Sequence, residues 1–186
     1  MATVLVPIAE GFEEIEAVAM IDIMRRGGIK VLVRSLNEEL NVTGANGIVL
    51  KAESSLIDVS ADDIDMIALP GGWGGTDNLA EDENVQNLLK AMDAKGKDIG
   101  AICAAPFALN TAGVLKQNFT CYPSVEEKIR TEGYQGDSAQ VVQDANVMTS
   151  RGPGTSICFA LQIIKRLVDE ETYAAVREGV LATYCD

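Results

Sequence analysis

Cys103 is the residue whose setting most directly indicates chemistry. It stands where an apolar stretch, residues 99–102, runs into an expected helix over residues 104–112. Small residues, Ala101 and Ala105, flank it two positions away, which is the pattern of a nucleophile elbow, because that turn is too tight for large neighbours. A thiol at a helix N-terminus feels the positive end of the helix dipole, which favours the thiolate. The alternative is a buried structural cysteine, which is common in protein cores.

Glu16 is the second candidate, because a helical wheel over residues 12–26 places it inside an apolar stripe. Its neighbours on the wheel are Phe12, Met20 and Ile23. A carboxylate in such a setting is costly unless it is protonated or partnered. Burial raises the pKa of a carboxyl, and the protonated form can donate a hydrogen bond.

Other acids near the start of this helix keep a simpler interpretation open. Glu13 and Glu14 point elsewhere on the wheel and fit first-turn acids that the helix dipole favours. Glu16 also fits that role. Asp22 has apolar neighbours too, so the wheel alone does not single out Glu16.

A glycine-rich segment follows the expected strand over residues 65–69. Gly71 and Gly72 lie at its start, and glycine lets backbone N–H groups approach a ligand closely. With the N–H of Ala104, the N–H of Gly72 would form an oxyanion hole. The alternative is a plain glycine-rich turn, and the segment is not a dinucleotide-binding GxGxxG motif.

Several classes of catalytic and metal-binding site are excluded because the residues they require are missing. Histidine is absent, which excludes Ser-His-Asp and Cys-His catalysis and HExxH zinc sites. Residues 150–156 precede a helix but lack the lysine of a phosphate-binding loop, so we interpret them as a shaped turn with Thr155 or Ser156 near the helix cap. No metal or nicotinamide site is recognisable, and we expect no cofactor.

The chain has four cysteines, at positions 103, 121, 158 and 185. None forms a CxxC pair, which argues against a zinc knuckle or a thioredoxin-like site. Because no secretion signal supports disulfides, we expect reduced thiols. Cys158 lies in an apolar run and is expected in the core.

The composition bounds the class of protein. The chain has 186 residues, 47% of them hydrophobic, which suits one domain over residues 1–186. Its formal net charge is -13, and so acidic a protein is not expected to bind nucleic acid or an anionic membrane. No apolar run approaches a membrane span, and the N-terminus lacks the basic region of a signal peptide, so we expect a cytoplasmic protein.

Strand-like and helix-like patterns alternate along the chain. Strands are expected over residues 2–8, 29–33, 65–69 and 99–102, and helices over 13–26, 83–94, 104–112, 154–168 and 170–182. Asn46-Gly47 predicts a β-hairpin, and residues 141–148 a second, shorter one. Alternation with nearly all-apolar strands predicts an α/β fold with a parallel sheet covered on both faces.

Three segments taken together resemble one family, the parkinsonism-associated protein deglycase branch of the ThiJ/PfpI superfamily. They are residues 9–16 (AEGFEEIE), 69–72 (LPGG) and 101–106 (AICAAP). Residues 22–31 (DIMRRGGIKV) and 149–156 (TSRGPGTS) strengthen the resemblance. The matches run through nearly the whole chain in order, and their combination is specific.

The resemblance implies a flavodoxin-like (class I glutamine amidotransferase-like) sandwich and a homodimer. It implies that Cys103 is the reactive cysteine and Glu16 its protonated partner, which holds the sulfinate that forms when the cysteine oxidises. Activities in the family include cofactor-free conversion of α-oxoaldehydes (glyoxalase III), repair of glycated proteins and protection from oxidative stress. A small aldehyde or a glycated protein is therefore the expected substrate.

One position departs from the family pattern. Some members place a histidine just before the proline of Cys121-Tyr122-Pro123, where this chain has Tyr122. Tyrosine, with a pKa near ~10, is a poor base at neutral pH, so proton transfer falls to Glu16. Tyr122 stays a candidate for the substrate pocket.

Three functions remain open from the sequence. The first is a weak glyoxalase III-type lyase or deglycase, the second a redox sensor in which oxidation of Cys103 is the function, and the third a chaperone-like dimer. The dimer is expected to form through the first helix, where Ile15, Val18 and Ile21 are left over beyond the core stripe.

Overall fold

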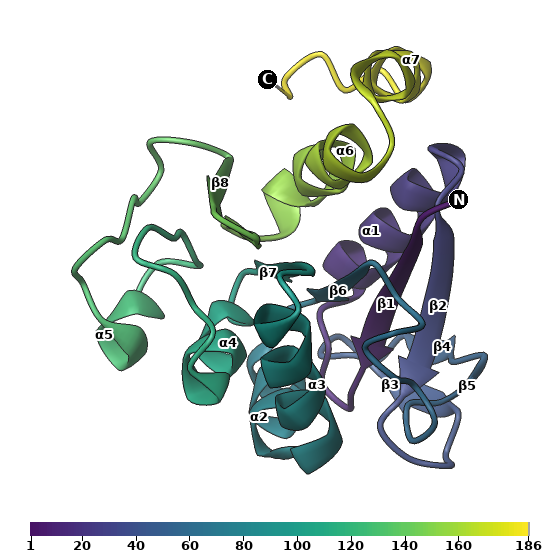
Figure 1. Cartoon of the computed structure of the whole chain (residues 1–186), viewed down its shortest axis with the longest axis vertical. Coiled ribbons are helices and arrows are strands. Elements are labelled where there is room, and N and C mark those ends of the chain that lie inside the picture. The colour runs from purple at the N-terminus through teal and green to yellow at the C-terminus, as the bar shows by residue number, and fades with distance from the viewer. Residues whose placement is uncertain (186) are drawn as a thin grey trace.

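A seven-stranded sheet forms the centre of the protein, as a computed structural model that describes residues 1–185 shows. Its order is β5 (Ser54–Ser55), β2 (Lys30–Ser35), β1 (Thr3–Ile8), β6 (Met66–Leu69), β7 (Asp98–Ile102), β9 (Val147–Ser150) and β8 (Val141–Asp144). Every neighbouring pair is parallel except β8 and β9, which are antiparallel. Figure 1 shows the sheet between two groups of helices.

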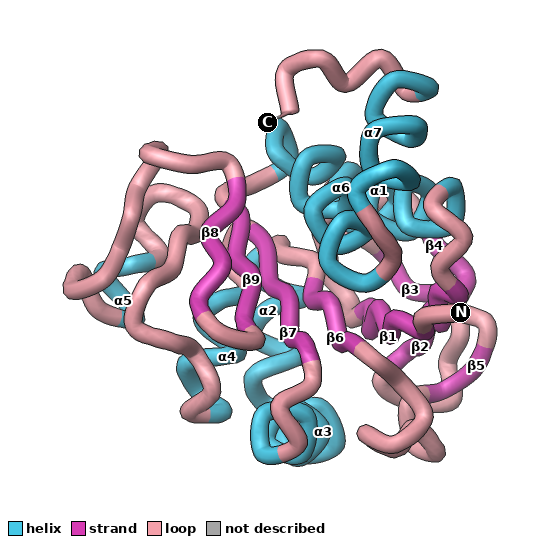
Figure 2. Tube along the Cα trace, turned by 45° about the horizontal axis from the view of Figure 1, so that its top comes forward, coloured by secondary structure: helices cyan, strands magenta, loops and turns pink. Residues whose placement is uncertain are grey.

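The helices cover both faces of this sheet. On one side lie α1 (Glu14–Arg26) and α6 (Ser156–Leu167), with α7 (Glu170–Gly179) packed on α6. On the other side lie α2 (Trp73–Glu81), α3 (Glu83–Ala94) and α4 (Pro106–Ala112) (Figure 2). Two short elements complete the fold, α5 (Glu126–Ile129) and the 3-10 turn η1 (Pro153–Thr155). Within residues 1–185, no helix combines the length and apolarity that crossing a bilayer requires.

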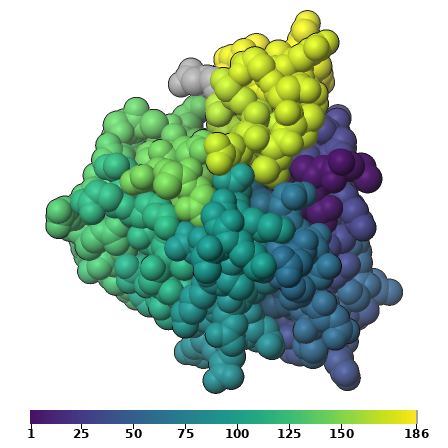
Figure 3. All heavy atoms as spheres, in the orientation of Figure 1, coloured from purple at the N-terminus to yellow at the C-terminus, as the bar shows by residue number. Residues whose placement is uncertain are grey.

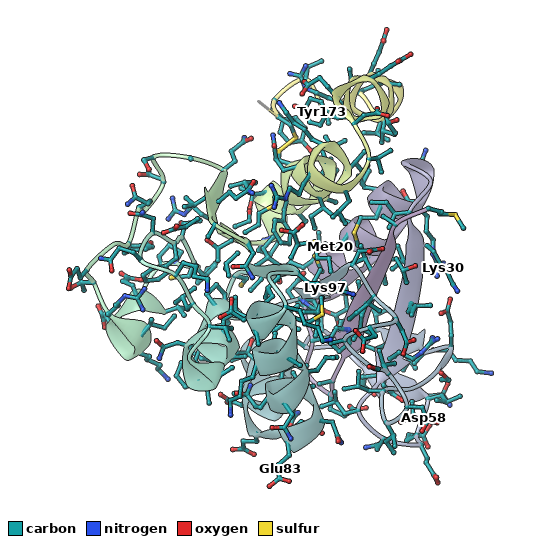
Figure 4. The ribbon with its side chains drawn as sticks, viewed as in Figure 1. Met20, Lys30, Asp58, Glu83, Lys97 and Tyr173 are labelled. Carbon is teal, nitrogen blue, oxygen red and sulfur yellow. A yellow bond between two sulfur atoms is a disulfide. The ribbon has the colours of Figure 1, made fainter. Side chains whose placement is uncertain are left out.

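Successive strand residues divide between two hydrophobic cores. Val4 and Val6 face the core beneath α1 and α6, whereas Leu5 between them faces the core beneath α3 and α4. This follows from the strand geometry, in which successive side chains point to opposite faces. Met20 of α1 is fully buried in the first core (Figure 4). The expected flavodoxin-like α/β fold, with a mostly parallel sheet between helices, is confirmed.

Most of the expected elements are present to within a few residues. The hairpin predicted at Asn46-Gly47 is formed by β3 (Asn41–Thr43) and β4 (Val49–Lys51), which pair antiparallel. Helix α2 was not expected, because its first residues belong to the glycine-rich segment. Glycine is needed there, since a Cβ at Gly75 would lie 2.8 Å from the Cα of Phe12.

The expectation that all cysteines are reduced thiols is wrong for two of them. Cys158 and Cys185 form a disulfide between α6 and the segment after α7. Cys158 is nevertheless buried, as its apolar sequence context predicted. Cys103 and Cys121 are free.

Candidate functional site

The candidate site lies at the carboxyl ends of two adjacent central strands. Cys103 directly follows β7, and Gly71 and Gly72 follow β6 after a single proline. Glu16, in the first turn of α1, reaches the same place from the helix that follows β1. In open α/β sheets this edge is where ligands bind, because the loops there converge on a crevice.

Cys103 sits in a backbone conformation that non-glycine residues rarely adopt. Its φ angle is 64°, in the left-handed region. Its N–H donates to the carbonyl of Ser150 at 3.0 Å, and its carbonyl accepts the N–H of Tyr122 at 2.9 Å. Since such a conformation persists only when its surroundings hold it, these two bonds stabilise the elbow that the sequence predicted.

The Cys103 sulfur is nearly enclosed, at 8% exposure of the residue. Burial raises the pKa of the thiol, and an ionised Glu16 raises it further. Hydrogen bonds from the N–H groups of Gly72 and Ala104 act in the opposite direction. The net direction is upward, so the expectation that a helix N-terminus favours the thiolate is wrong for the resting site. The physical reason is desolvation, together with a helix that begins only at Pro106.

Glu16 is fully buried, as the wheel suggested. Its Oε2 accepts the backbone N–H of Gly71 at 2.7 Å, while Oε1 has no hydrogen-bond partner of normal geometry among the described residues. Burial raises the pKa of this carboxyl to about 7, although bonds to Cys103 and Gly71 lower it. The group therefore exchanges a proton readily near neutral pH.

The glycines of this site are required by close packing. A Cβ at Gly71 would lie 2.6 Å from the Cβ of Cys103 and 2.7 Å from Glu16 Oε2. Gly72 has a φ of 84°, and a Cβ there would lie 2.4 Å from the carbonyl oxygen of Gly11. The segment is thus more than a glycine-rich turn: it brings two backbone N–H groups to the reactive side chains, Gly71 to Glu16 and Gly72 to Cys103.

Tyr122 lies next to the elbow, with an exposed side chain. It lines a shallow cavity of about 280 Å³ together with Arg151 and Pro153. The turn that contains Arg151 is also shaped as predicted, because the Thr155 hydroxyl accepts the N–H of Gly152 at 3.2 Å. Cys103 is not among the residues that line this cavity, so a role for Tyr122 in the substrate pocket stays a prediction.

Sequence reasoning missed the role of Glu14. Its side chain is buried and accepts the backbone N–H of Asn46 at 2.7 Å and that of Ile48 at 3.3 Å. It therefore holds the β3–β4 hairpin against α1 and is more than a first-turn acid. Glu13 is the N-cap of α1, since its side chain accepts the N–H of Glu16 at 2.8 Å.

The helical wheel left Asp22 as a second possible buried acid, but its side chain is exposed. Asp22 pairs on the surface with Arg26 at 2.8 Å, so it is not a second buried acid. Ile21, which was expected to be left over for a dimer contact, is instead buried in the first core. Among the described residues, no group of three histidine, cysteine or acidic side chains is placed to hold a metal ion.

Comparisons with known proteins identify a family and a fold. A family model described as the DJ-1/PfpI family matches residues 2–166. Protein dj-1beta of Drosophila melanogaster is 39% identical over 181 residues, which are 97% of each chain. The glutathione-independent glyoxalase DJR-1.2 of Caenorhabditis elegans is 38% identical, over 91% of this chain and 90% of that protein. The crystal structure of Drosophila DJ-1beta superimposes with a TM-score of 0.92 at 38% identity, covering 97% of both chains.

Proposed function

The chain belongs to the DJ-1/PfpI family, and we propose that it is a stress-protection protein that converts small α-oxoaldehydes, free or attached to protein, without a cofactor. The observation that carries this proposal is the pairing of Cys103 with Glu16, a buried carboxyl whose pKa is raised to about 7 by desolvation. A Caenorhabditis elegans relative named as a glutathione-independent glyoxalase supports the substrate class.

In the first step Glu16 activates the thiol. Because burial raises the pKa of Cys103, its resting form is the neutral thiol. A carboxyl with a pKa near 7 is ionised in part of the molecules at neutral pH, and this fraction accepts the thiol proton as the sulfur attacks the aldehyde carbon. The new carbon–sulfur bond gives a hemithioacetal, whose oxyanion the N–H groups of Gly72 and Ala104 stabilise.

The later steps need one proton carrier and water. Glu16 first gives the thiol proton to the hemithioacetal oxyanion, which restores its carboxylate. The carboxylate then removes the proton from the carbon bound to sulfur while the adjacent carbonyl oxygen takes up a proton from water, and the product is an enediol. Glu16 returns its proton to the adjacent carbon as the hydroxyl on the sulfur-bearing carbon loses its proton to water, which leaves a thioester. Water then hydrolyses the thioester, releasing a 2-hydroxy acid and restoring the thiol. Since Glu16 and water serve every proton transfer and Tyr122 stands where some relatives have histidine, we expect slow turnover.

A second candidate function rests on the same pair. A protonated Glu16 beside Cys103 would donate a hydrogen bond to an oxygen of a cysteine sulfinate. Oxidation of Cys103, rather than turnover, would then be the functional event. Product formed from an aldehyde by fully reduced protein distinguishes the enzyme from the sensor.

We also propose a homodimer through α1 and the neighbouring hairpin. Ile15 and Val18 on α1 are 59% and 48% exposed, and Ile48 of the hairpin is 60% exposed. Because Glu14 ties the hairpin to α1, these side chains lie on neighbouring elements. Exposed apolar side chains gathered in this way favour association with a second copy.

The experiment that tests the enzymatic proposal measures lactate formed from methylglyoxal. Reduced wild-type protein is compared with Cys103→Ala and with Glu16→Gln, and Asp22→Asn serves as a matched control on the exposed side of α1. Activity in wild type and the control, lost in the two site variants, supports the proposal. Activity that survives Cys103→Ala overturns it.

A further inference from the structure

We propose that the Cys158–Cys185 disulfide is a redox-sensitive clasp that positions the backbone of Cys103. The bond ties the segment after α7 to α6 (Figure 4). Both cysteines are buried, at 2% and 1% exposure, whereas Leu181 and Tyr184 in the same segment are 79% and 53% exposed. The segment is therefore a thin outer layer with the disulfide beneath it.

This layer also contacts the edge of the sheet. Figure 3 shows the C-terminal part of the chain, in yellow, at the molecular surface beside the green part of the chain. A hydrogen bond joins the C-terminal segment to the residue before β8: the Gln140 Nε2 donates to the carbonyl of Tyr184 at 2.9 Å. Tyr184 directly precedes Cys185, so the disulfide holds the acceptor of this bond in place.

From Gln140 a short series of hydrogen bonds leads to the candidate site. The Ser150 hydroxyl donates to the carbonyl of Gln140 at 2.7 Å. The carbonyl of Ser150 in turn accepts the N–H of Cys103 at 3.0 Å. Cys103 depends on such bonds, because its φ of 64° is unfavourable for a residue with a side chain. The clasp and the elbow are thus joined through two residues of the β8–β9 region.

Because of its position in the sheet, β8 would be destabilised by reduction of the disulfide. It is the edge strand of the sheet and pairs with β9 alone. An edge strand that loses a covering segment opens more easily than a central one, since local stability follows the number of contacts. The disulfide closes a loop with a sequence separation of 27, which disfavours the detached state of the segment.

A dithiol would open the clasp by ordinary exchange. One thiolate attacks a sulfur of the disulfide, forms a mixed disulfide and displaces the other sulfur as a thiolate, which takes up a proton. The second thiol then closes the reagent's own disulfide and releases the remaining cysteine thiol. Two electrons pass from the dithiol to the protein. Because both cysteines are buried, the reagent reaches them when the outer segment opens locally.

Hydrogen exchange on the full chain tests the proposal without relying on the proposed activity. Protein purified without reductant is compared with protein treated with dithiothreitol and with Cys158→Ser/Cys185→Ser, with Cys103 in the thiol form throughout. We expect exchange to become about threefold faster or more in residues 181–185, in residues 141–150 and at the Cys103 amide. Acceleration confined to residues 181–185 would overturn the proposal, as would two free thiols at positions 158 and 185 before reduction.

A second pair of variants leaves the disulfide intact. Gln140→Ala removes the bond to Tyr184 and should accelerate exchange at residues 141–150 and at Cys103. Gln143→Ala is the matched control, because its side chain donates within the hairpin to the carbonyl of Ala145. Equal exchange at Cys103 in both variants would contradict the connection through Gln140.

Discussion

The Glu16 carboxyl accepts the backbone N–H of Gly71 at 2.7 Å, and this bond fixes the buried acid beside Cys103. A glycine at position 71 is what permits the approach, because any Cβ there would meet both reactive side chains. The pairing of thiol and carboxyl therefore depends on the backbone of a third segment.

Gly71→Ala should disrupt the site more than the fold. The added methyl lies under 3 Å from Cys103 and Glu16, so one of the two must move. We expect a loss of roughly 1–3 kcal/mol in the free energy of unfolding, as for other overpacked sites, and an at least tenfold lower rate of product formation. Urea unfolding and the lactate assay measure the two effects. Gly179→Ala, in α7, is the control, because a Cβ there meets nothing within 4 Å. Equal effects of both substitutions would refute the steric argument.

Stability should fall as pH rises because of Glu16. Burial raises the pKa of the carboxyl from 4.5 to about 7, so between these values the folded state binds more protons than the unfolded state. The stabilisation is complete below pH 4.5 and is lost as pH rises through 7, and its size is at most about 3 kcal/mol. Urea unfolding at pH 5 and pH 8 measures it. In Glu16→Gln the free energies of unfolding at pH 5 and pH 8 should differ less than in the wild type, by a similar amount. If that difference is unchanged, another group is responsible for the pH dependence.

Mild peroxide should oxidise Cys103 before Cys121. Cys103 is 8% exposed whereas Cys121 is fully buried, and burial raises the pKa of both thiols, so access of the peroxide decides the order. We expect the product at Cys103 to stop at the sulfinate, held by the protonated Glu16. Peptide mass spectrometry identifies the site and the oxidation state. Glu16→Gln should slow the reaction because it removes the proton acceptor, and an unchanged rate would argue against the pairing.

Val18→Asp should convert a dimer into a monomer. The substitution places a charge in the exposed apolar surface formed by Ile15, Val18 and Ile48, and an unpaired charge is costly to bury in an interface. Light scattering at micromolar concentration gives the molar mass. Val168→Asp is the control, because Val168 is also exposed, at 41%, but lies at the end of α6. A monomeric wild-type protein would remove the basis for this interface.

Much of the site could be predicted from the sequence, because its signals are local. The small-x-Cys-x-small pattern around Cys103 predicts a tight turn, and the helical wheel over residues 12–26 predicts the buried face of α1. Both depend on residues a few positions apart. The same holds for the strands, whose apolar runs follow from burial on both faces.

What could not be predicted depends on residues that meet only after folding. The Cys158–Cys185 bond needs two Cα atoms 5.1 Å apart, and the spacing of cysteines in a sequence does not give that distance. Glu14 finds its partners in a hairpin 32 residues away. The pKa of Cys103 was expected to fall because the dipole is visible in the sequence, whereas the burial that raises it is not.

The central claim is that Cys103 and Glu16 act together on α-oxoaldehydes. Its most direct test is the pH dependence of lactate formation from methylglyoxal by the reduced protein, in wild type, Glu16→Gln and Cys103→Ala. We expect the wild-type kcat/KM to rise with pH through a midpoint near 7, where the carboxyl becomes a base. In Glu16→Gln the midpoint should disappear and kcat/KM should fall roughly 100-fold. Cys103→Ala should form no lactate. A wild-type rate that is independent of pH between 6 and 8, or equal in Glu16→Gln, would contradict the account.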